Sequence, residues 1–95
     1  MKLEIRWSEN ARNSFRDVVE QIKDKWTDKE VSAFVKKVDR TLAIISVSPH
    51  VYQSTPYEGV HRAVVITKQT SVLYKANGDF VDILFFWDNR QDPML

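Results

Sequence analysis

The dipeptide Asn77-Gly78 constrains this chain more than any other feature, because it lies between two runs of apolar residues. Asn-Gly is the strongest short-range signal for a β-hairpin, since both residues accept the positive φ angles of a tight turn. Residues 70–76 and 80–87 are therefore expected to form paired antiparallel strands. A third strand, residues 61–67, is expected to precede them across a turn at Lys68-Gln69. The fold must contain this sheet.

Two helices are expected before the sheet. Residues 2–7 alternate between apolar and charged side chains, which predicts a first strand. Ser8 follows in the position of an N-cap, and apolar residues then recur at helical spacing from Ala11 to Trp26. A second helix begins at Thr27-Asp28-Lys29-Glu30, a capping box in which side chain and backbone bond reciprocally. The two helices are adjacent in sequence, so they are expected to form a tight hairpin.

The second helix is expected to end before Pro49, because a residue that precedes proline avoids helical geometry. Residues 49–60 contain two prolines and a glycine, which predicts an irregular connection. The resulting order is strand, helix, helix, strand, strand, strand. This order predicts an α+β fold, in which a helical hairpin packs on one face of a mostly antiparallel four-stranded sheet. We expect one domain over residues 1–95.

Composition narrows the class of protein. Hydrophobic residues make up 43% and charged residues 28%, as in an ordinary folded domain. The chain has no cysteine, and His50 and His61 lack the spacing of a metal site, so we expect no disulfide, metal or cofactor. No apolar run spans a membrane or resembles a signal peptide, so we expect a cytoplasmic protein. The net charge of +1 is low for a protein whose main ligand is nucleic acid, because phosphate contacts usually require a clear excess of basic residues.

Two-residue turns fix the strand register and hence which side chains share a face of the sheet. The face expected under the helices contains Ala63, Val65, Val72, Tyr74, Val81, Ile83, Phe85 and Trp87. The opposite, open face contains Arg62, Val64, Ile66, Ser71, Leu73, Lys75, Phe80, Asp82, Leu84 and Phe86. An apolar face with a charged rim usually marks a partner surface. The alternative is that residues 49–60, with Val51, Tyr52 and Tyr57, fold over part of it.

Four residues are candidates for chemistry on a phosphodiester: His61, Arg62, Lys68 and Arg90. Arginine and lysine would neutralise charge in the transition state, and His61 or Tyr74 would move a proton. Structural explanations compete for each of them. His61 starts a strand at the surface, Tyr74 suits the core, Lys68 suits a turn, and Arg90 in the polar tail suits an ion pair with a neighbouring aspartate. Arg62 is the hardest to explain structurally, because the rest of its strand is apolar.

Several short motifs together resemble the RelE/ParE toxin family over nearly the whole chain. They are Trp7 and Ala11, the helical hairpin, Pro49, Glu58-Gly59-Val60-His61-Arg62, Val72-Leu73-Tyr74 and Asn89-Arg90-Gln91-Asp92-Pro93. The resemblance implies the RelE/ParE-like β-α-α-β-β-β fold. It also implies the toxin of a bacterial type II toxin–antitoxin pair, bound in a hetero-oligomer by a cognate antitoxin protein.

The resemblance further implies that an extended antitoxin segment wraps the sheet and helices of the toxin. On the open face we expect antitoxin contacts at Val64, Ile66, Leu73, Phe80, Leu84 and Phe86. The exposed side of the second helix carries Lys29, Lys36, Lys37 and Arg40. These cations form either a solvated face or a surface for an acidic partner segment, and we assign Lys36 and Arg40 to the antitoxin.

The family implies one of two activities. Its RelE-like branch cleaves messenger RNA on the ribosome with cations on the open face, whereas its ParE-like branch poisons DNA gyrase. Arg62 matches a basic position of the first branch, but Val64 and Ser71 stand where that branch favours lysine and arginine. Losing one such group typically costs on the order of a hundredfold in rate, so the ParE-like branch is favoured. The expected target contacts are Arg62, Lys68 and Arg90. An mRNA endoribonuclease and a non-toxic partner-binding module remain the alternatives.

Overall fold

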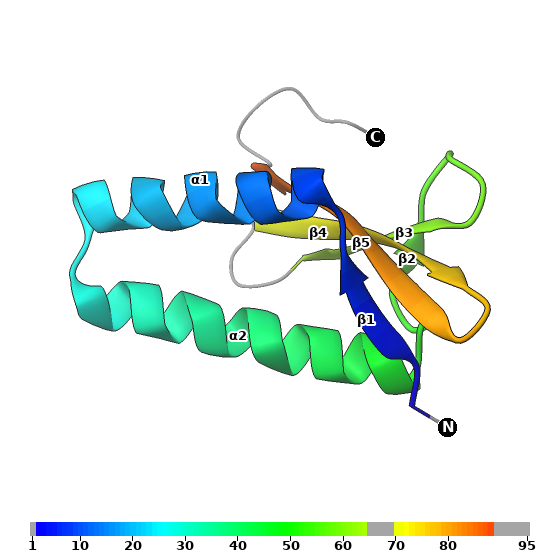
Figure 1. Ribbon diagram of the computed structural model, residues 1–95. Coiled ribbons are helices and arrows are strands. Elements are labelled where there is room, and N and C mark those ends of the chain that lie inside the picture. Colours follow the sequence, from blue (N-terminus) through cyan, green and yellow to red (C-terminus); the bar gives the residue numbers. More distant parts are fainter. Residues whose placement is uncertain (1, 65–69, 89–95) are drawn as a thin grey trace.

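Two helices lie side by side over one face of a five-stranded sheet in the computed structural model, which describes residues 2–64 and 70–88 (Figure 1). The elements are β1 (Glu4–Trp7), α1 (Glu9–Lys25), α2 (Asp28–Val47), β2 (Gln53–Ser54), β3 (Val60–Val64), β4 (Thr70–Asn77) and β5 (Phe80–Asp88). The strand order is β1-β5-β4-β3-β2, with β1 parallel to β5 and the other pairs antiparallel. The expected α+β architecture is confirmed, with five strands in place of the predicted four.

The additional strand, β2, comes from the segment expected to be irregular. Gln53 pairs with Arg62, and Ser54 pairs with His61. The loop between β2 and β3 is closed beside this ladder, because the Thr55 N–H donates to the Val60 carbonyl at 2.9 Å. A strand of two residues is too short to show an apolar alternation, so the sequence carried no signal for it.

Both helices begin and end where local sequence signals place them. The Ser8 hydroxyl accepts a hydrogen bond from the Ala11 N–H at 3.0 Å and donates to the Leu84 carbonyl at 2.8 Å. It therefore caps α1 and also ties the helix to β5. The Glu30 carboxylate accepts from the Thr27 N–H at 3.0 Å, which forms one half of the predicted capping box. The helix α2 ends at Val47, before Pro49, as expected.

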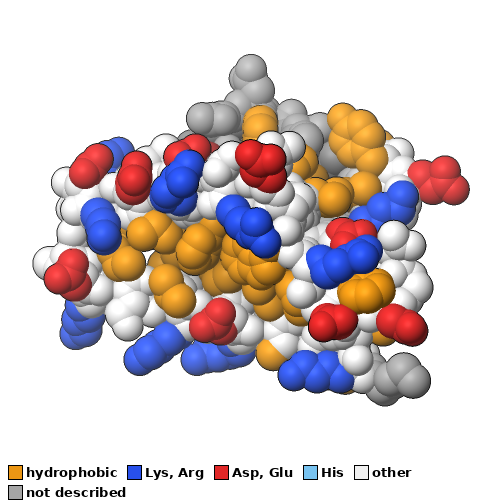
Figure 2. All heavy atoms as spheres, viewed as in Figure 1, with side chains coloured by type: hydrophobic (Ala, Val, Ile, Leu, Met, Phe, Trp, Pro, Cys, Tyr) orange, Lys and Arg blue, Asp and Glu red, His pale blue; other side chains and the backbone are white. Residues whose placement is uncertain are grey.

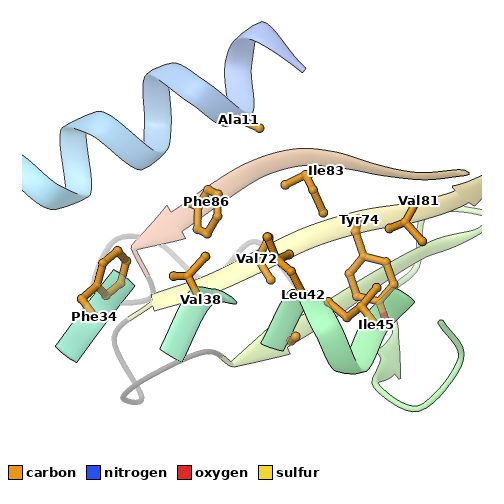
Figure 3. Close-up of a cluster of buried hydrophobic side chains, with 11 residues drawn as sticks. Ala11, Phe34, Val38, Leu42, Ile45, Val72, Tyr74, Val81, Ile83 and Phe86 are labelled. Carbon is orange, nitrogen blue, oxygen red and sulfur yellow. The ribbon is translucent and has the colours of Figure 1, made fainter. Parts of the chain in front are cut away.

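The core fills the space between the hairpin and the sheet, where side chains from both layers point toward one another (Figure 3). Four aromatic rings join β1, α1, α2 and β5: Trp7, Phe15, Phe34 and Phe86. Phe86 stacks on Trp7 with ring centroids 5.5 Å apart, and it lies 5.3 Å from Phe15. Phe15 in turn stacks on Phe34 at 5.8 Å. This cluster fixes the hairpin over the end of the sheet.

The two hairpins differ from the predicted register by an even number of residues. Asn77 is itself paired in the β4–β5 ladder, so Gly78-Asp79 forms the loop, with Gly78 at a φ of 62°. In the β3–β4 ladder, Val72 pairs with Ala63, two residues from its predicted partner. An even shift keeps each side chain on its predicted face. Five predicted core residues are accordingly buried: Ala63, Val72, Tyr74, Val81 and Ile83.

A β-bulge changes the second half of β5. Opposite the step between Leu73 and Tyr74, β5 carries one extra residue, Leu84, and the residues after it are displaced by one. Such a displacement moves every later side chain to the other face. Phe86, predicted on the open face, is only 4% exposed and belongs to the core. Phe85 and Trp87, predicted under the helices, lie on the open face instead. The predicted faces of these three residues were wrong.

One large residue of the connection between α2 and β3 packs on the helix side of the sheet. Tyr52 is partly buried against the core cluster, whereas Val51 and Tyr57 are exposed. One expectation was that these three residues would cover part of the open face. The structure places Tyr52 against the core instead, so this segment extends the hydrophobic layer under the helices.

Candidate target-binding surface on the open face of the sheet

Arg62 projects from β3 onto the open face and is held by the neighbouring strand. Its Nε donates a hydrogen bond to the hydroxyl of Ser71 at 3.0 Å. Ser71 is fully buried, so the bond anchors the guanidinium stem to an ordered part of β4. The expectation that Arg62 lies on this face is met. A fixed arginine loses less conformational entropy on binding than a free one.

An aromatic pair from β5 lies on the same face as Arg62. Phe85 pairs in register with Leu73, and Trp87 pairs with Ser71. The Phe85 and Trp87 rings meet edge to face with centroids 6.2 Å apart. Within the described part of the chain, the indole N–H of Trp87 is buried and has no hydrogen-bond partner. A buried donor without an acceptor is costly to the folded state.

The opposite end of the open face is occupied by an ion pair. Arg6 of β1 binds the Asp82 carboxylate through two nitrogens, at 2.7 and 3.1 Å. These hydrogen bonds lower the pKa of Asp82. The Arg6 guanidinium also lies 3.8 Å from the centre of the Phe80 ring. Phe80, predicted as an antitoxin contact, is therefore covered on one side by a cation of its own chain, and its role stays a prediction.

His61 and Tyr74 point to the helix side of the sheet, away from Arg62. The His61 ring stacks on Tyr74 at 5.4 Å, and its Nδ1 donates to the Tyr52 carbonyl at 3.0 Å. His61 is only 8% exposed, so the surface position considered for it was wrong. The Tyr74 hydroxyl donates to the Pro49 carbonyl at 2.7 Å, and burial raises the pKa of Tyr74 to about 12. The sheet therefore separates both candidate proton carriers from Arg62.

The other predicted site residues are distributed over the molecule. Leu73 is only 2% exposed, Leu84 is half-buried at the bulge, and Val64 pairs with Ser71 at the end of β3. Lys36 and Arg40 are exposed on α2. Ile66, Lys68 and Arg90 lie outside the described residues, as do Val65 and Gln69. The assignment of these side chains to an antitoxin or a target stays a prediction.

A cavity of about 400 Å³ lies between α1 and the end of β5, beside the aromatic pair. Its lining consists of Asn10, Asn13, Ser14, Asp17, Val18, Gln21, Phe85, Phe86, Trp87 and Asp88. The two walls meet where the Phe86 N–H donates to the Ser14 hydroxyl at 2.9 Å. This cavity was not predicted, because its polar residues recur at helical spacing and resemble a solvated helix face. The signal available in the sequence was the grouping of Asn10, Asn13 and Gln21 on one side of the first helix.

The described part of the open face is suited to binding a protein. It combines an ordered arginine with a tryptophan and a phenylalanine, and arginine and tryptophan are enriched at the energetic centres of protein interfaces. In the described parts of β3, β4 and β5, His61 and Tyr74 both face the core. Across residues 2–64 and 70–88, no three His, Cys, Asp or Glu side chains gather into a metal site. No helix in these ranges is long and apolar enough to cross a membrane.

Comparison with known proteins identifies the fold. No protein-family model matches the sequence, and no curated protein matches it. A chain of the chromosomal ParDE TA system from P. aeruginosa has a TM-score of 0.78 at 10% identity, over 92% of this chain and 96% of that one. A chain of the toxin–antitoxin complex RelBE2 from Mycobacterium tuberculosis has a TM-score of 0.60 at 17% identity, over 93% and 99%. This chain therefore has the RelE/ParE-like fold that its motifs indicated.

Proposed function

We propose that this chain is the toxin of a bacterial type II toxin–antitoxin pair. It acts in the cytoplasm in the ParE-like manner, by binding and inhibiting DNA gyrase, and a cognate antitoxin neutralises it. The observation that carries the proposal is the fold shared with a chain of the ParDE system, at a TM-score of 0.78 over 92% of this chain. The open face supports it, since Arg62, Phe85 and Trp87 lie together there.

The positions of His61 and Tyr74 favour binding over RNA cleavage. Phosphodiester cleavage needs a proton donor or acceptor within hydrogen-bond reach of the reacting oxygens. His61 is buried on the helix side, and the pKa of Tyr74 is raised to about 12, so neither serves a substrate bound beside Arg62. Ser71, which stands where the ribonuclease branch favours arginine, is fully buried and supplies no charge. These observations favour the gyrase-directed branch.

One observation favours the second candidate, a ribosome-dependent mRNA endoribonuclease. Arg62 lies on the face that this branch uses and is held in place by Ser71, as a phosphate contact requires. In this alternative Lys68 and Arg90 would supply further charge. The third candidate is a partner-binding module without toxicity, which would keep the antitoxin surface and lose the target surface.

The experiment that separates the candidates follows thymidine and methionine incorporation in one culture after brief induction of the chain. Gyrase poisoning predicts that thymidine incorporation fails first, and that the purified chain inhibits supercoiling by purified gyrase. An early collapse of methionine incorporation would establish the endoribonuclease alternative. Unchanged growth and unchanged incorporation of both labels would leave only the non-toxic module.

The target surface is tested with the double variant Arg62→Ala/Arg90→Ala. We expect it to lose toxicity, because it removes two of the three cations assigned to the target. Arg12→Ala is the matched control, since Arg12 is an exposed arginine on α1. Full killing by the double variant at equal protein level would refute the site assignment. Loss of killing by Arg12→Ala as well would mean that general positive charge, and not this face, carries the activity.

A further inference from the structure

The Asn77-Gly78 pair lies at the exposed turn between β4 and β5. Asn77 pairs with Phe80, so the loop consists of Gly78 and Asp79. Gly78 has a φ of 62° and Asp79 has a negative φ, which is the pattern of a type II′ turn. Asn77, Gly78 and Asp79 are all exposed. Water therefore reaches both the side chain of Asn77 and the peptide bond that follows it.

The amide group of Gly78 takes no part in holding this turn. In a two-residue loop the ladder bonds belong to the flanking residues, here Asn77 and Phe80. The Asp79 carbonyl accepts a bond from the Glu4 N–H at 2.9 Å, but within residues 2–64 and 70–88 no backbone turn bond is donated by Gly78. A Cβ at Gly78 would meet nothing within 4 Å. The Gly78 nitrogen is thus unshielded beside the Asn77 side chain.

The chemistry of the pair follows from its covalent structure. The side-chain carbonyl carbon of Asn77, Cγ, is an electrophile, and attack by the Gly78 nitrogen on it closes a five-membered ring. A side chain on the following residue would obstruct such an attack, and glycine has none. A helix prevents the reaction, because it holds that nitrogen in a hydrogen bond. Gly78 is under neither restraint.

We propose that Asn77 is a site of spontaneous covalent modification, in which the Gly78 nitrogen displaces ammonia from the Asn77 side chain. A bond forms between the Gly78 nitrogen and Asn77 Cγ, and the bond between Cγ and the amide nitrogen breaks. The proton of the Gly78 N–H leaves with the amide group as ammonia, and the product is a cyclic succinimide. Water then opens the ring, at the Cγ carbonyl to leave aspartate or at the backbone carbonyl to leave isoaspartate.

Asn10 provides the contrast within the same chain. It is exposed, as Asn77 is. The N–H that follows it belongs to Ala11, which is buried and donates to the Ser8 hydroxyl at 3.0 Å. Asn13 is likewise followed by a residue inside α1, whose N–H is held in the helical hydrogen-bond pattern. Exposure alone therefore does not select Asn77, and the unbonded nitrogen of Gly78 does.

The modification would change the charged end of the open face. Hydrogen bonds from Arg6 and from the Asn77 amide lower the pKa of Asp82. A carboxylate at position 77 has no proton to donate, and it would add a second negative charge beside Asp82. In Figure 2, acidic and basic side chains lie close together over the end of the molecule at which Figure 1 shows this turn. Isoaspartate would in addition insert its Cβ into the main chain of the turn.

The inference is tested on the purified full chain, made by cell-free synthesis and kept folded at mildly alkaline pH. Trypsin releases residues 7–12, which contain Asn10, and residues 76–90, which contain Asn77. Mass spectrometry of samples taken over days follows the replacement of NH2 by OH in each peptide, and fragment ions locate it. We expect it at Asn77, as two products of equal mass that separate by chromatography. The Asn77→Asp variant identifies one of them, and a sample digested at once measures what digestion itself introduces.

Two variants test the mechanism. Gly78→Ala places a methyl group beside the attacking nitrogen and should slow the modification at least about tenfold, which corresponds to about 1.4 kcal/mol in the barrier. Asn77→Gln keeps an exposed amide but must close a six-membered ring, so it should give no measurable product over the same period. Both positions are exposed, and circular dichroism verifies that each variant is folded.

Equal modification of Asn77 and Asn10, or an unchanged rate in Gly78→Ala, would overturn the inference. So would a folded chain that stays unmodified while the same chain in urea reacts, since the turn would then protect Asn77. The modified chain should also elute later from an anion-exchange column, because it carries one more negative charge, and an unchanged elution would contradict the assignment. All these outcomes are independent of the proposed function, because none of them is read through toxicity or through a partner.

Discussion

Replacing Phe86 by alanine should destabilise the fold far more than replacing its neighbour Phe85. Phe86 is 4% exposed and contacts the rings of Trp7 and Phe15 at 5.5 and 5.3 Å. Replacing a buried phenylalanine by alanine typically costs about 3–5 kcal/mol in total, and two aromatic contacts of about 0.5–1.5 kcal/mol each place Phe86 in the upper part of this range. We therefore expect a loss of about 4–5 kcal/mol. The bond from the Phe86 N–H to Ser14 is retained in alanine, so the change measures the ring alone.

Urea unfolding followed by far-ultraviolet circular dichroism measures this loss through the secondary structure. Its signal does not depend on the fluorescence of Trp7, which contacts Phe86. A domain of this size has a free energy of unfolding of about 5–14 kcal/mol, so the Phe86→Ala variant is expected to be marginal. Its midpoint should fall by about 2 M urea. Phe85→Ala is the matched control, with an expected loss of about 1–2 kcal/mol, because Phe85 is half-buried outside the core cluster. The reverse order of the two losses would mean that β5 has no bulge and would refute the observed register.

Three further predictions follow from individual contacts. Tyr74→Phe removes the hydrogen bond to the Pro49 carbonyl and should lower the free energy of unfolding in urea by about 1–2 kcal/mol. In the unaltered chain, burial raises the pKa of Tyr74 to about 12, so its absorbance should titrate only at about pH 12. The pKa of Asp82 is lowered in the folded chain, so its carboxylate stabilises the fold at any pH above about 3.9, the pKa in the unfolded chain. This stabilisation is lost as the pH falls through the pKa of the folded chain. Arg6→Gln should therefore raise the pKa of Asp82 in a carboxyl NMR titration and flatten the stability curve below about pH 4, by less than about 1 kcal/mol for so exposed a pair. Gly78→Ala should cost about 1 kcal/mol, since Gly78 has a φ of 62° that alanine avoids although its Cβ would meet open space.

Local signals predicted most of the fold. The capping box at Thr27, the N-cap at Ser8 and the proline at position 49 are short-range features whose physics is complete within a few residues. The helix-covered face was predicted through parity, since hairpin loops that differ by two residues leave every side chain on the same face. This is why Tyr74 and Ile83 were placed in the core although the predicted pairing was wrong.

The bulge in β5 could not be predicted from the sequence. Residues 84–87 are all apolar, so no alternation specifies which of them faces the helices. The choice is made by tertiary packing, because the space beside Trp7 and Phe15 accepts Phe86. His61 is a different case. It lies two residues from the buried Ala63, so the alternation of its strand already placed it under the helices, and its candidacy as a surface acid or base disagreed with that register.

The distribution of side chains implies that the core, the open face and the outer side of α2 can be altered one at a time. The core lies between the helices and the sheet, Arg62 and the aromatic pair lie on the opposite face, and Val47 is exposed at the end of α2. Effects of substitutions at such separated positions are usually additive, because the sites share no contacts. A variant that combines Arg62→Ala with Val47→Gln should therefore lower the free energy of unfolding by the sum of the two single effects, of which the lost bond to Ser71 contributes about 1 kcal/mol. Strong coupling between these two substitutions would show that the two positions share contacts and would refute their separation.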